Sequence, residues 1–179
     1  MTYIHPNRIV VTGPESTGKT AAVMHIASAF GVQYSLEFAR TYLERLERKY
    51  TYEDLVPIAR GQAAWIDTAS LEASKRGDQW VVADTDLLTI YLWSLIKFGK
   101  VDSYVVEILD RQRADFYLLM YSDIPWEPDP LREDPGTRKA IFKRYLKEIK
   151  KRNIPHKIIR GTGRERTLSV EKAMMEILH

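Results

Sequence analysis

Short apolar runs alternate with longer helical patterns along the whole chain. Five apolar runs predict strands, at 9–11, 32–36, 80–83, 115–120 and 156–159. Apolar residues three or four apart predict helices at about 21–30, 37–50, 51–76, 87–98, 102–113, 137–152 and 164–178. Strands that alternate with helices form a parallel sheet covered on both faces. The pattern therefore predicts an α/β fold, a three-layer sandwich around a five-stranded parallel sheet, with 1–179 as one domain.

The first predicted strand leads into a glycine-rich loop and then directly into a helical pattern. The loop, GPESTGKT, matches the G-x-x-x-x-G-K-[ST] template for binding nucleotide phosphates. Two glycines let backbone N–H groups approach phosphate oxygens. Lys19 supplies a positive charge, which makes it a candidate catalytic residue, and the Thr20 hydroxyl is placed to hold Mg²⁺. The residues expected to bind ATP are Gly13, Pro14, Glu15, Ser16, Thr17, Gly18, Lys19 and Thr20.

Polar residues or polar loops follow four of the predicted strands. They are the glycine-rich loop, Glu37, the pair Asp84 and Asp86, and the loop after Met120. The carboxyl ends of parallel strands meet at one edge of a sheet, where ligands gather. We therefore expect these residues in one cleft.

Glu37 directly precedes a helical pattern, and two interpretations are open. It is either a first-turn acid favoured by the helix dipole or a base that accepts the proton of a substrate hydroxyl attacking the γ-phosphate. Arg40 lies one turn later and would face the same cleft. We predict that Glu37 is catalytic and that both residues bind the acceptor substrate.

Asp84 and Asp86 end the apolar run at 80–83. Asp84 is typical of an acid that holds Mg²⁺ beside a phosphate-binding loop. Asp86 could simply cap the helix that follows. Because two carboxylates so close together repel, we predict that Asp84 binds the metal and that Asp86 binds sugar hydroxyls.

Residues 122–136, SDIPWEPDPLREDPG, hold four prolines in fifteen residues. Such a segment is either a stiff connector or a functional loop. We predict a short lid at about 122–138 that closes over the phosphates and excludes water. Arg132 is its candidate catalytic residue, Arg138 would bind ATP, and Trp126 and Asp129 would contact the acceptor.

One tryptophan interrupts an alanine- and isoleucine-rich helical stripe. An aromatic residue at helical spacing usually belongs to the core, but Trp65 could also offer a stacking surface to a flat ring. The turn at 161–163 is a weaker candidate for contacting adenine.

Composition narrows the remaining classes. The chain has no cysteine, which excludes disulfides and thiolate metal sites, and its four histidines have no metal-ligand spacing. It has no long apolar stretch and no signal-like start, so we expect a cytoplasmic protein that is not membrane-bound. The net charge is only +3 and the basic run at 138–152 is typical of a solvated helix face, so nucleic-acid binding is not expected.

Several motifs, taken together, resemble the nicotinamide riboside kinase domain of the NadR family, within the P-loop kinase superfamily. The matching blocks, in family order, are GPESTGKT, EFAR, ARGQ, ADTDLLT and DIPWEPDPLRE. The glycine-rich loop is widespread, whereas the combination of E-x-x-R, D-T-D and P-W-x-x-D-x-L-R is much more specific. The resemblance covers nearly the whole chain.

The resemblance implies transfer of the ATP γ-phosphate to the 5′-hydroxyl of nicotinamide riboside, with ATP and Mg²⁺ bound and nicotinamide mononucleotide formed for NAD salvage. Family members often carry an aromatic residue just before the E-x-x-R glutamate, whereas this chain has Leu36, which favours Trp65 as the stacking partner. Longer relatives carry an adenylyltransferase domain before the kinase domain. Only eight residues precede the first predicted strand, so that activity is not expected here.

Two alternatives remain open. A kinase for another nucleoside would use the same chemistry with a different ring pocket. A P-loop ATPase or nucleotide-dependent regulator would act through a protein partner instead of a small acceptor. The lid-like segment and Glu37 favour a bound acceptor.

Overall fold

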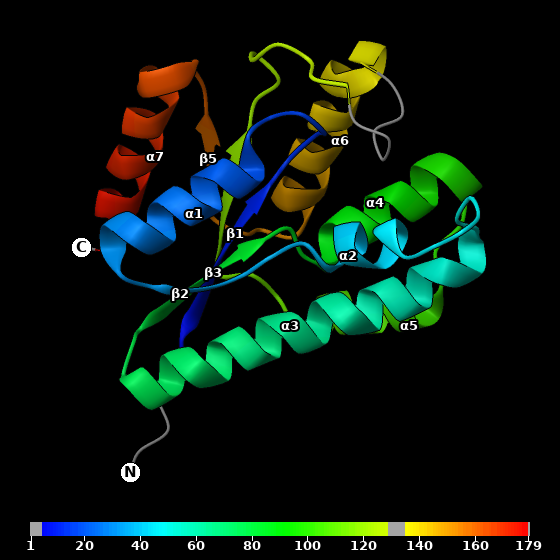
Figure 1. The fold of residues 1–179 in the computed structure, drawn as a ribbon, viewed down its shortest axis with the longest axis horizontal. Helices are drawn as coiled ribbons and strands as arrows, with labels where there is room; N and C mark the ends of the chain where they lie inside the picture. The colour runs from blue at the N-terminus through cyan, green and yellow to red at the C-terminus, as the bar shows by residue number, and fades with distance from the viewer. Residues whose placement is uncertain (1–4, 129–134, 179) are drawn as a thin grey trace.

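The strands form a single sheet in which every described strand runs parallel to its neighbours (Figure 1). The computed structural model describes residues 5–128 and 135–178. Within these residues the strands are β1 (Asn7–Thr12), β2 (Gln33–Ser35), β3 (Trp80–Asp84), β4 (Phe116–Met120) and β5 (His156–Ile159). Their order in the sheet is β2-β3-β1-β4-β5. The predicted five-stranded parallel sheet is therefore confirmed.

The helices follow the predicted pattern closely. They are α1 (Lys19–Phe30), α2 (Phe38–Glu44), α3 (Leu55–Arg76), α4 (Leu87–Phe98), α5 (Ser103–Arg111), α6 (Arg138–Lys151) and α7 (Gly163–Leu178), with 3₁₀ turns η1 (Tyr52–Asp54) and η2 (Pro135–Thr137). Gly31, Gly77 and Gly99 end α1, α3 and α4 in the left-handed conformation that glycine adopts without strain.

One predicted helix is shorter than expected. The pattern at 37–50 predicts helix throughout, but α2 ends at Glu44. Beyond it, the Arg48 guanidinium donates to both carboxylate oxygens of Asp54, at 2.7 and 2.9 Å. The backbone N–H of Thr51 donates to the same carboxylate at 2.7 Å. These contacts to the start of α3 hold the chain in an irregular loop instead of a helix.

Alternating side chains of the strands belong to two hydrophobic layers. On one face, Ile9 and Val11 of β1 pack with residues of α1 and α7. On the other face, Val10 packs with residues of α3, α4, α5 and α6. Figure 1 shows the same division, with α1 and α7 on one side of the sheet. This arrangement is the predicted three-layer sandwich.

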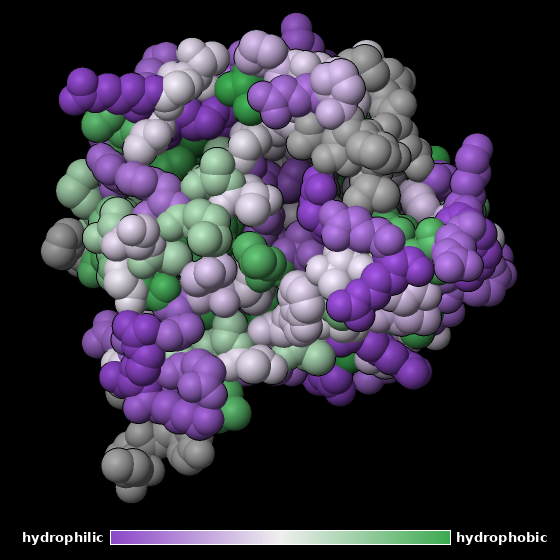
Figure 2. Space-filling view, in the orientation of Figure 1, coloured by the Kyte–Doolittle hydropathy of each residue, from purple (hydrophilic) through white to green (hydrophobic). Residues whose placement is uncertain are grey.

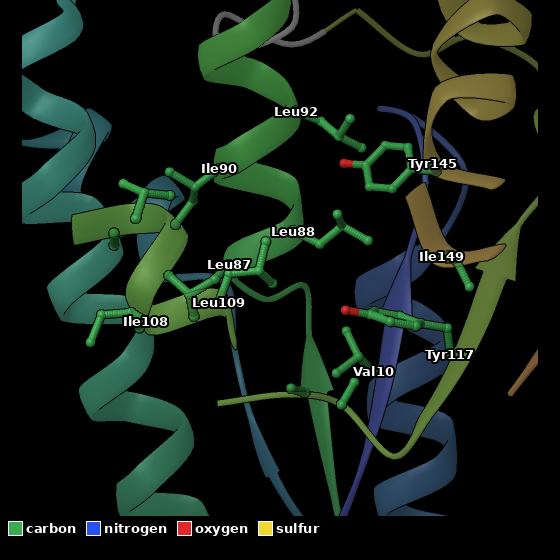
Figure 3. Packing of buried hydrophobic residues seen from close by; sticks show 14 of the residues in the cluster. Val10, Leu87, Leu88, Ile90, Leu92, Ile108, Leu109, Tyr117, Tyr145 and Ile149 are labelled. Atoms are coloured by element: carbon green, nitrogen blue, oxygen red, sulfur yellow. The ribbon is translucent and has the colours of Figure 1, made fainter. Parts of the chain in front are cut away.

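The larger hydrophobic layer contains two buried tyrosines whose hydroxyl groups have partners (Figure 3). The Tyr117 hydroxyl donates to Asp86 at 2.5 Å, and the Tyr145 hydroxyl donates to Thr89 at 3.2 Å. A buried hydroxyl without a partner is costly, so these bonds allow large aromatic rings to fill the core.

Among the described helices, none is both long enough and apolar enough to cross a membrane.

Candidate active site

A cavity of about 340 Å³ opens at the carboxyl ends of the central strands. Its wall combines the glycine-rich loop with residues of α2, α3 and α4. The lining residues are Gly13, Glu15, Ser16, Thr17, Gly18, Lys19, Thr20, Ala21, Glu37, Ala39, Arg40, Leu43, Tyr50, Leu55, Ile58, Gln62, Thr85, Thr89, Ile90 and Trp93. Figure 2 shows a recess near the centre of this face of the molecule, with hydrophilic residues inside it. The glycine-rich loop, Glu37 and Arg40 thus line one cavity, whereas Asp84, Asp86 and the described residues after Met120, which we expected in the same cleft, are not among its lining residues.

The glycine-rich loop joins β1 to α1 by crossing the end of β4. Gly13 has φ of 137°, and a Cβ at this position would lie only 2.7 Å from the Met120 carbonyl oxygen. Any larger residue would push the loop away from the sheet. Gly18, with φ of 75°, then begins α1, so the helix N-terminus points at the loop.

Side chains of the loop bind its own backbone. The Thr17 hydroxyl and the Lys19 ammonium both donate to the Pro14 carbonyl oxygen, at 2.8 and 2.9 Å. Because both side chains bind the same carbonyl oxygen, the loop is bent back on itself, and the Lys19 ammonium is held against the loop backbone. The arrangement concentrates N–H groups and one positive charge at the cavity, which is the chemistry that holds phosphates.

Thr20 and Asp84 form the candidate metal site. The Thr20 hydroxyl donates to Asp84 Oδ2 at 2.5 Å, and Asp84 Oδ1 is buried without a hydrogen-bond partner. Burial raises the pKa of Asp84, and the charges of Lys19 and Arg40 and the bond from Thr20 oppose that rise. A hydroxyl beside a buried carboxylate oxygen that lacks a partner fits Mg²⁺, which prefers oxygen ligands.

Glu37 lies between β2 and α2 and lines the cavity together with the glycine-rich loop. It is the residue that precedes α2, with φ −74° and ψ 111°, and its side chain does not cap the helix. Arg40 lies one turn further along α2, where its guanidinium is 3.6 Å from Glu44. The structure thus brings an acid and a cation to the cavity that the glycine-rich loop also lines.

The rest of the cavity wall contributed by α2, α3, α4 and the loop after α2 is largely apolar and aromatic. Leu43, Leu55, Ile58 and Ile90 line it together with Tyr50 and Trp93. Tyr50 comes from the loop after α2, where its ring packs edge-on against Phe98, with centroids 6.3 Å apart. This wall has the shape and chemistry to receive a flat organic ring.

Asp86 does not line the cavity. Its carboxylate accepts from the Leu88 N–H at 3.1 Å, which caps α4, and from the Tyr117 hydroxyl. It is 2% exposed, and burial raises its pKa to about 6. The structure therefore supports the helix-cap interpretation of Asp86, and its predicted contact with sugar hydroxyls has no support from its position.

Trp65 is also absent from the cavity wall. Its ring packs edge-on against Phe38, with centroids 5.1 Å apart, between α2 and α3. The tryptophan that lines the cavity is Trp93, from the apolar helix at 87–98. Packing between helices therefore accounts for Trp65, and its position gives no support to the predicted stacking role.

The first part of the predicted lid rests on the glycine-rich loop. The Ser16 hydroxyl donates to the Pro125 carbonyl at 3.4 Å and accepts from the Glu127 N–H at 3.0 Å. Arg138 donates to the Ser16 carbonyl at 3.0 Å and lies 5.7 Å from the centre of the Trp126 ring. Arg138 and Trp126 thus meet beside the loop, outside the cavity wall.

Two predicted lid residues, Asp129 and Arg132, lie outside the described residues.

The turn at 161–163 follows β5. In this turn, the backbone N–H of Gly161 donates to the Asp123 carboxylate at 2.8 Å. The turn that we predicted near adenine therefore contacts the start of the lid segment.

Sequence reasoning missed several residues of the cavity, namely Tyr50, Gln62, Thr89 and Trp93. For two of them a signal was present, because Thr89 and Trp93 are four residues apart and therefore lie on one face of the helix that follows Asp84. Thr89 also lies 3.3 Å from the Thr12 hydroxyl at the end of β1. Because nearly all residues of this helix are apolar, the pattern did not distinguish the face with Thr89 and Trp93 from the residues of the core.

Comparisons with known proteins agree with this geometry. Residues 8–166 match the AAA domain family. The chain is 30% identical over 152 residues to the trifunctional NAD biosynthesis/regulator protein NadR of Salmonella typhimurium, and 29% identical over 150 residues to NadR of Escherichia coli. These matches cover 82% and 81% of this chain but 36% of each relative, so the chain spans about a third of their length.

Solved structures show the same fold. A crystal structure of NadR in complex with NR has a TM-score of 0.75 and 18% identity, covering 96% of this chain and 50% of that chain. A NadR complex with NAD and AMP-PNP has a TM-score of 0.73 and 17% identity, covering 96% and 49%. Thymidylate kinase from Ehrlichia chaffeensis has a TM-score of 0.62 and 14% identity, covering 97% and 99%. The chain therefore belongs to the AAA domain family and has the P-loop kinase fold of its relative NadR.

Proposed function

We propose that the protein transfers the γ-phosphate of ATP to the 5′-hydroxyl of nicotinamide riboside. The observation that carries the proposal is the shared cavity, which is lined both by the glycine-rich loop and by Glu37, Arg40 and an aromatic wall. A nucleotide hydrolase needs only the glycine-rich loop. Glu37, Arg40 and the aromatic wall are suited to a small acceptor that has both a hydroxyl group and a flat ring.

In the proposed step, the 5′-oxygen attacks the γ-phosphorus while the bond from that phosphorus to the β,γ-bridging oxygen breaks. ADP leaves with the electron pair of that bond. Glu37 accepts the proton of the attacking hydroxyl. Lys19 and Arg40, which both line the cavity, stabilise the negative charge on the phosphoryl oxygens.

Mg²⁺, when bound, would neutralise charge on the β- and γ-phosphates. Thr20 and Asp84 are the residues that would hold it, because their oxygens already adjoin and one oxygen of Asp84 lacks a partner. Among the described residues no group of three or more histidine, cysteine or acidic side chains forms another metal site. The ion would therefore complete its coordination with phosphate oxygens and water.

The aromatic wall supports a pyridine ring as the acceptor base. Trp93 and Tyr50 both line the cavity, and a positively charged ring is attracted to the face of an aromatic ring. One face of Tyr50 is already occupied by Lys97, whose Nζ lies 3.8 Å from the ring centroid, so Trp93 is the better candidate. A NadR protein that shares the fold at 18% identity has been crystallised in complex with NR, nicotinamide riboside. NadR of Salmonella typhimurium is 30% identical to this chain over 152 residues. Both points favour this riboside over other nucleosides.

An assay of ADP release tests the proposal. The purified protein is incubated with MgATP alone and with a panel of ribosides, namely nicotinamide riboside, nicotinic acid riboside, uridine, thymidine and adenosine. We expect slow ADP release from ATP alone, because no acceptor hydroxyl is then present in the site. A pyridine riboside should stimulate ADP release by at least about tenfold. Lys19→Ala is the control that should abolish the stimulation.

Two results would contradict the proposal in different ways. Stimulation by uridine, thymidine or adenosine alone would keep the kinase chemistry and change the acceptor. Strong ADP release that no riboside alters, or that only a protein or DNA stimulates, would favour the ATPase or regulator alternative.

A further inference from the structure

We propose that Gln62 is a positioning residue for Glu37, and that it acts by clamping the backbone on both sides of that acid. The inference rests on the proposed function, in which Glu37 accepts the proton of the acceptor hydroxyl. Gln62 belongs to the ARGQ motif of α3, whose role neither the phosphate site nor the metal site explains.

The two ends of the Gln62 carboxamide bind two different peptide groups. Its Oε1 accepts from the backbone N–H of Phe38 at 2.8 Å, and its Nε2 donates to the backbone carbonyl of Leu36 at 3.3 Å. These are the peptide groups immediately after and before Glu37. Gln62 is 1% exposed, so water does not compete for these bonds. The side chain therefore restrains the backbone dihedral angles of Glu37 directly.

The preceding residue, Gly61, provides a second part of the clamp. A Cβ at Gly61 would lie only 2.1 to 2.3 Å from atoms of the Phe38 ring. The ring thus sits directly on the backbone of α3, with Trp65 one turn later against its edge. Gly61 and Gln62 together fix Phe38 through its ring and its N–H.

The joint between β2 and α2 needs an external support. β2 is a three-residue edge strand, α2 has seven residues with none buried, and Glu37 does not cap α2 with its own side chain. Ala39, Tyr42 and Leu43 of α2 are only partly buried against the core, and such short elements are weakly held by themselves. The clamp from α3 supplies the order that a proton acceptor requires, since a displacement of about 1 Å can cost on the order of a hundredfold in rate.

The competing explanation is that Gln62 is only a satisfied polar residue of the core. The two explanations differ in what a variant does to catalysis when Glu37 is absent. A clamp that acts through Glu37 has nothing to position in the Glu37→Ala background, whereas a general loss of core order lowers the rate in any background.

The test is a double-mutant cycle with Gln62→Met and Glu37→Ala. Methionine has a similar length to glutamine but offers no comparable hydrogen bonds. We expect Gln62→Met to lower kcat about 10- to 100-fold, with little change in the KM for ATP. In the Glu37→Ala background the same substitution should change kcat by less than about twofold. Gln62→Glu, which can still accept from Phe38, should fall between Gln62→Met and the unmodified protein.

Gln112→Met is the matched control, because Gln112 is also buried and donates to Asp67 at 2.7 Å, in a separate cavity lined by Asn7 at the start of β1. It should lower the melting temperature without lowering kcat. Equal losses of kcat in both backgrounds, or an unchanged kcat in both Gln62 variants, would overturn the clamp. If Gln62→Met does not fold, Gln62→Glu in the two backgrounds decides by the same criterion. Absence of riboside phosphorylation in the unmodified protein would instead contradict the proposed function.

Discussion

Asp84 and Asp86 are two residues apart, yet they have different surroundings. Asp84 faces Thr20 and keeps one oxygen without a partner. Asp86 points into the core, where the Leu88 N–H and the Tyr117 hydroxyl both donate to it. The turn between them passes through Thr85, a non-glycine residue with φ of 62°. This backbone conformation turns the second acid away from the cavity and leaves the first one beside the phosphate-binding loop.

The buried position of Asp86 predicts an unusual dependence of stability on pH. Its pKa is about 6 in the folded protein, because of burial, and close to 4 in the unfolded chain. Its protonated form therefore contributes stability below about pH 4 that is lost as the pH rises through about 6, on the order of 2–3 kcal/mol. Asp86→Asn should remove this loss, because an asparagine oxygen can still cap α4.

Urea unfolding of both proteins at several pH values between 4 and 8 measures the effect. The stability of Asp86→Asn relative to the unmodified protein should increase with pH across this range. Parallel stability curves for the two proteins would show that Asp86 is ionised in the same way in the folded and unfolded states.

At the scale of elements, α2, α3 and α4 supply the part of the cavity wall that lies outside the glycine-rich loop. Only some of these residues could be predicted from the sequence. Glu37 was singled out because it follows a predicted strand, and strand ends in a parallel sheet converge; the same reasoning singled out Asp84, which is not a lining residue but accepts from Thr20 of the cavity wall. Trp93 and Gln62 lie within helices whose apolar pattern indicates core, and only the packing of the helices against one another brings them to the cavity. The early end of α2 could not be predicted either, because the contact between Arg48 and Asp54 that holds the following loop is not visible in the apolar pattern.

The two tryptophans should therefore respond differently to substitution. Trp93→Leu should raise the KM for nicotinamide riboside roughly tenfold, because it removes a ring surface from the cavity wall. The KM for ATP should stay nearly constant. Trp65→Leu should lower the melting temperature and leave the KM for the riboside unchanged, because this ring packs between helices.

Steady-state kinetics with each substrate varied in turn, together with thermal unfolding, separates these effects. A raised KM for the riboside in Trp65→Leu but not in Trp93→Leu would restore the stacking role to Trp65.

At the scale of the whole molecule, the strand order explains where the cavity forms. β1 lies in the middle of the sheet, with β3 on one side and β4 on the other. The chain first builds the β2–β3 side and then crosses to build the β4–β5 side, so the connections diverge at β1. Ligand sites in open parallel sheets form at this kind of crevice. The glycine-rich loop follows β1 directly, and Glu37 and Thr85, which follow β2 and β3, line the same cavity.

The alternation of strands and helices made this architecture predictable, because the pattern of each element is local and strong. The predicted lid at about 122–138 remains a prediction. The Ser16 hydroxyl donates to the Pro125 carbonyl and Arg138 donates to the Ser16 carbonyl, whereas Asp129 and Arg132 lie outside the described residues. Their predicted contacts with the acceptor and the phosphates stay predictions.

The most direct test of the central claim follows the phosphoryl group itself. The protein is incubated with Mg²⁺, nicotinamide riboside and ATP labelled at the γ-phosphate, and the products are separated. The account predicts label in a riboside 5′-phosphate, little label in inorganic phosphate, and no transfer to the 5′-deoxy riboside. Label that accumulates only as inorganic phosphate, whether or not the riboside is present, would contradict it.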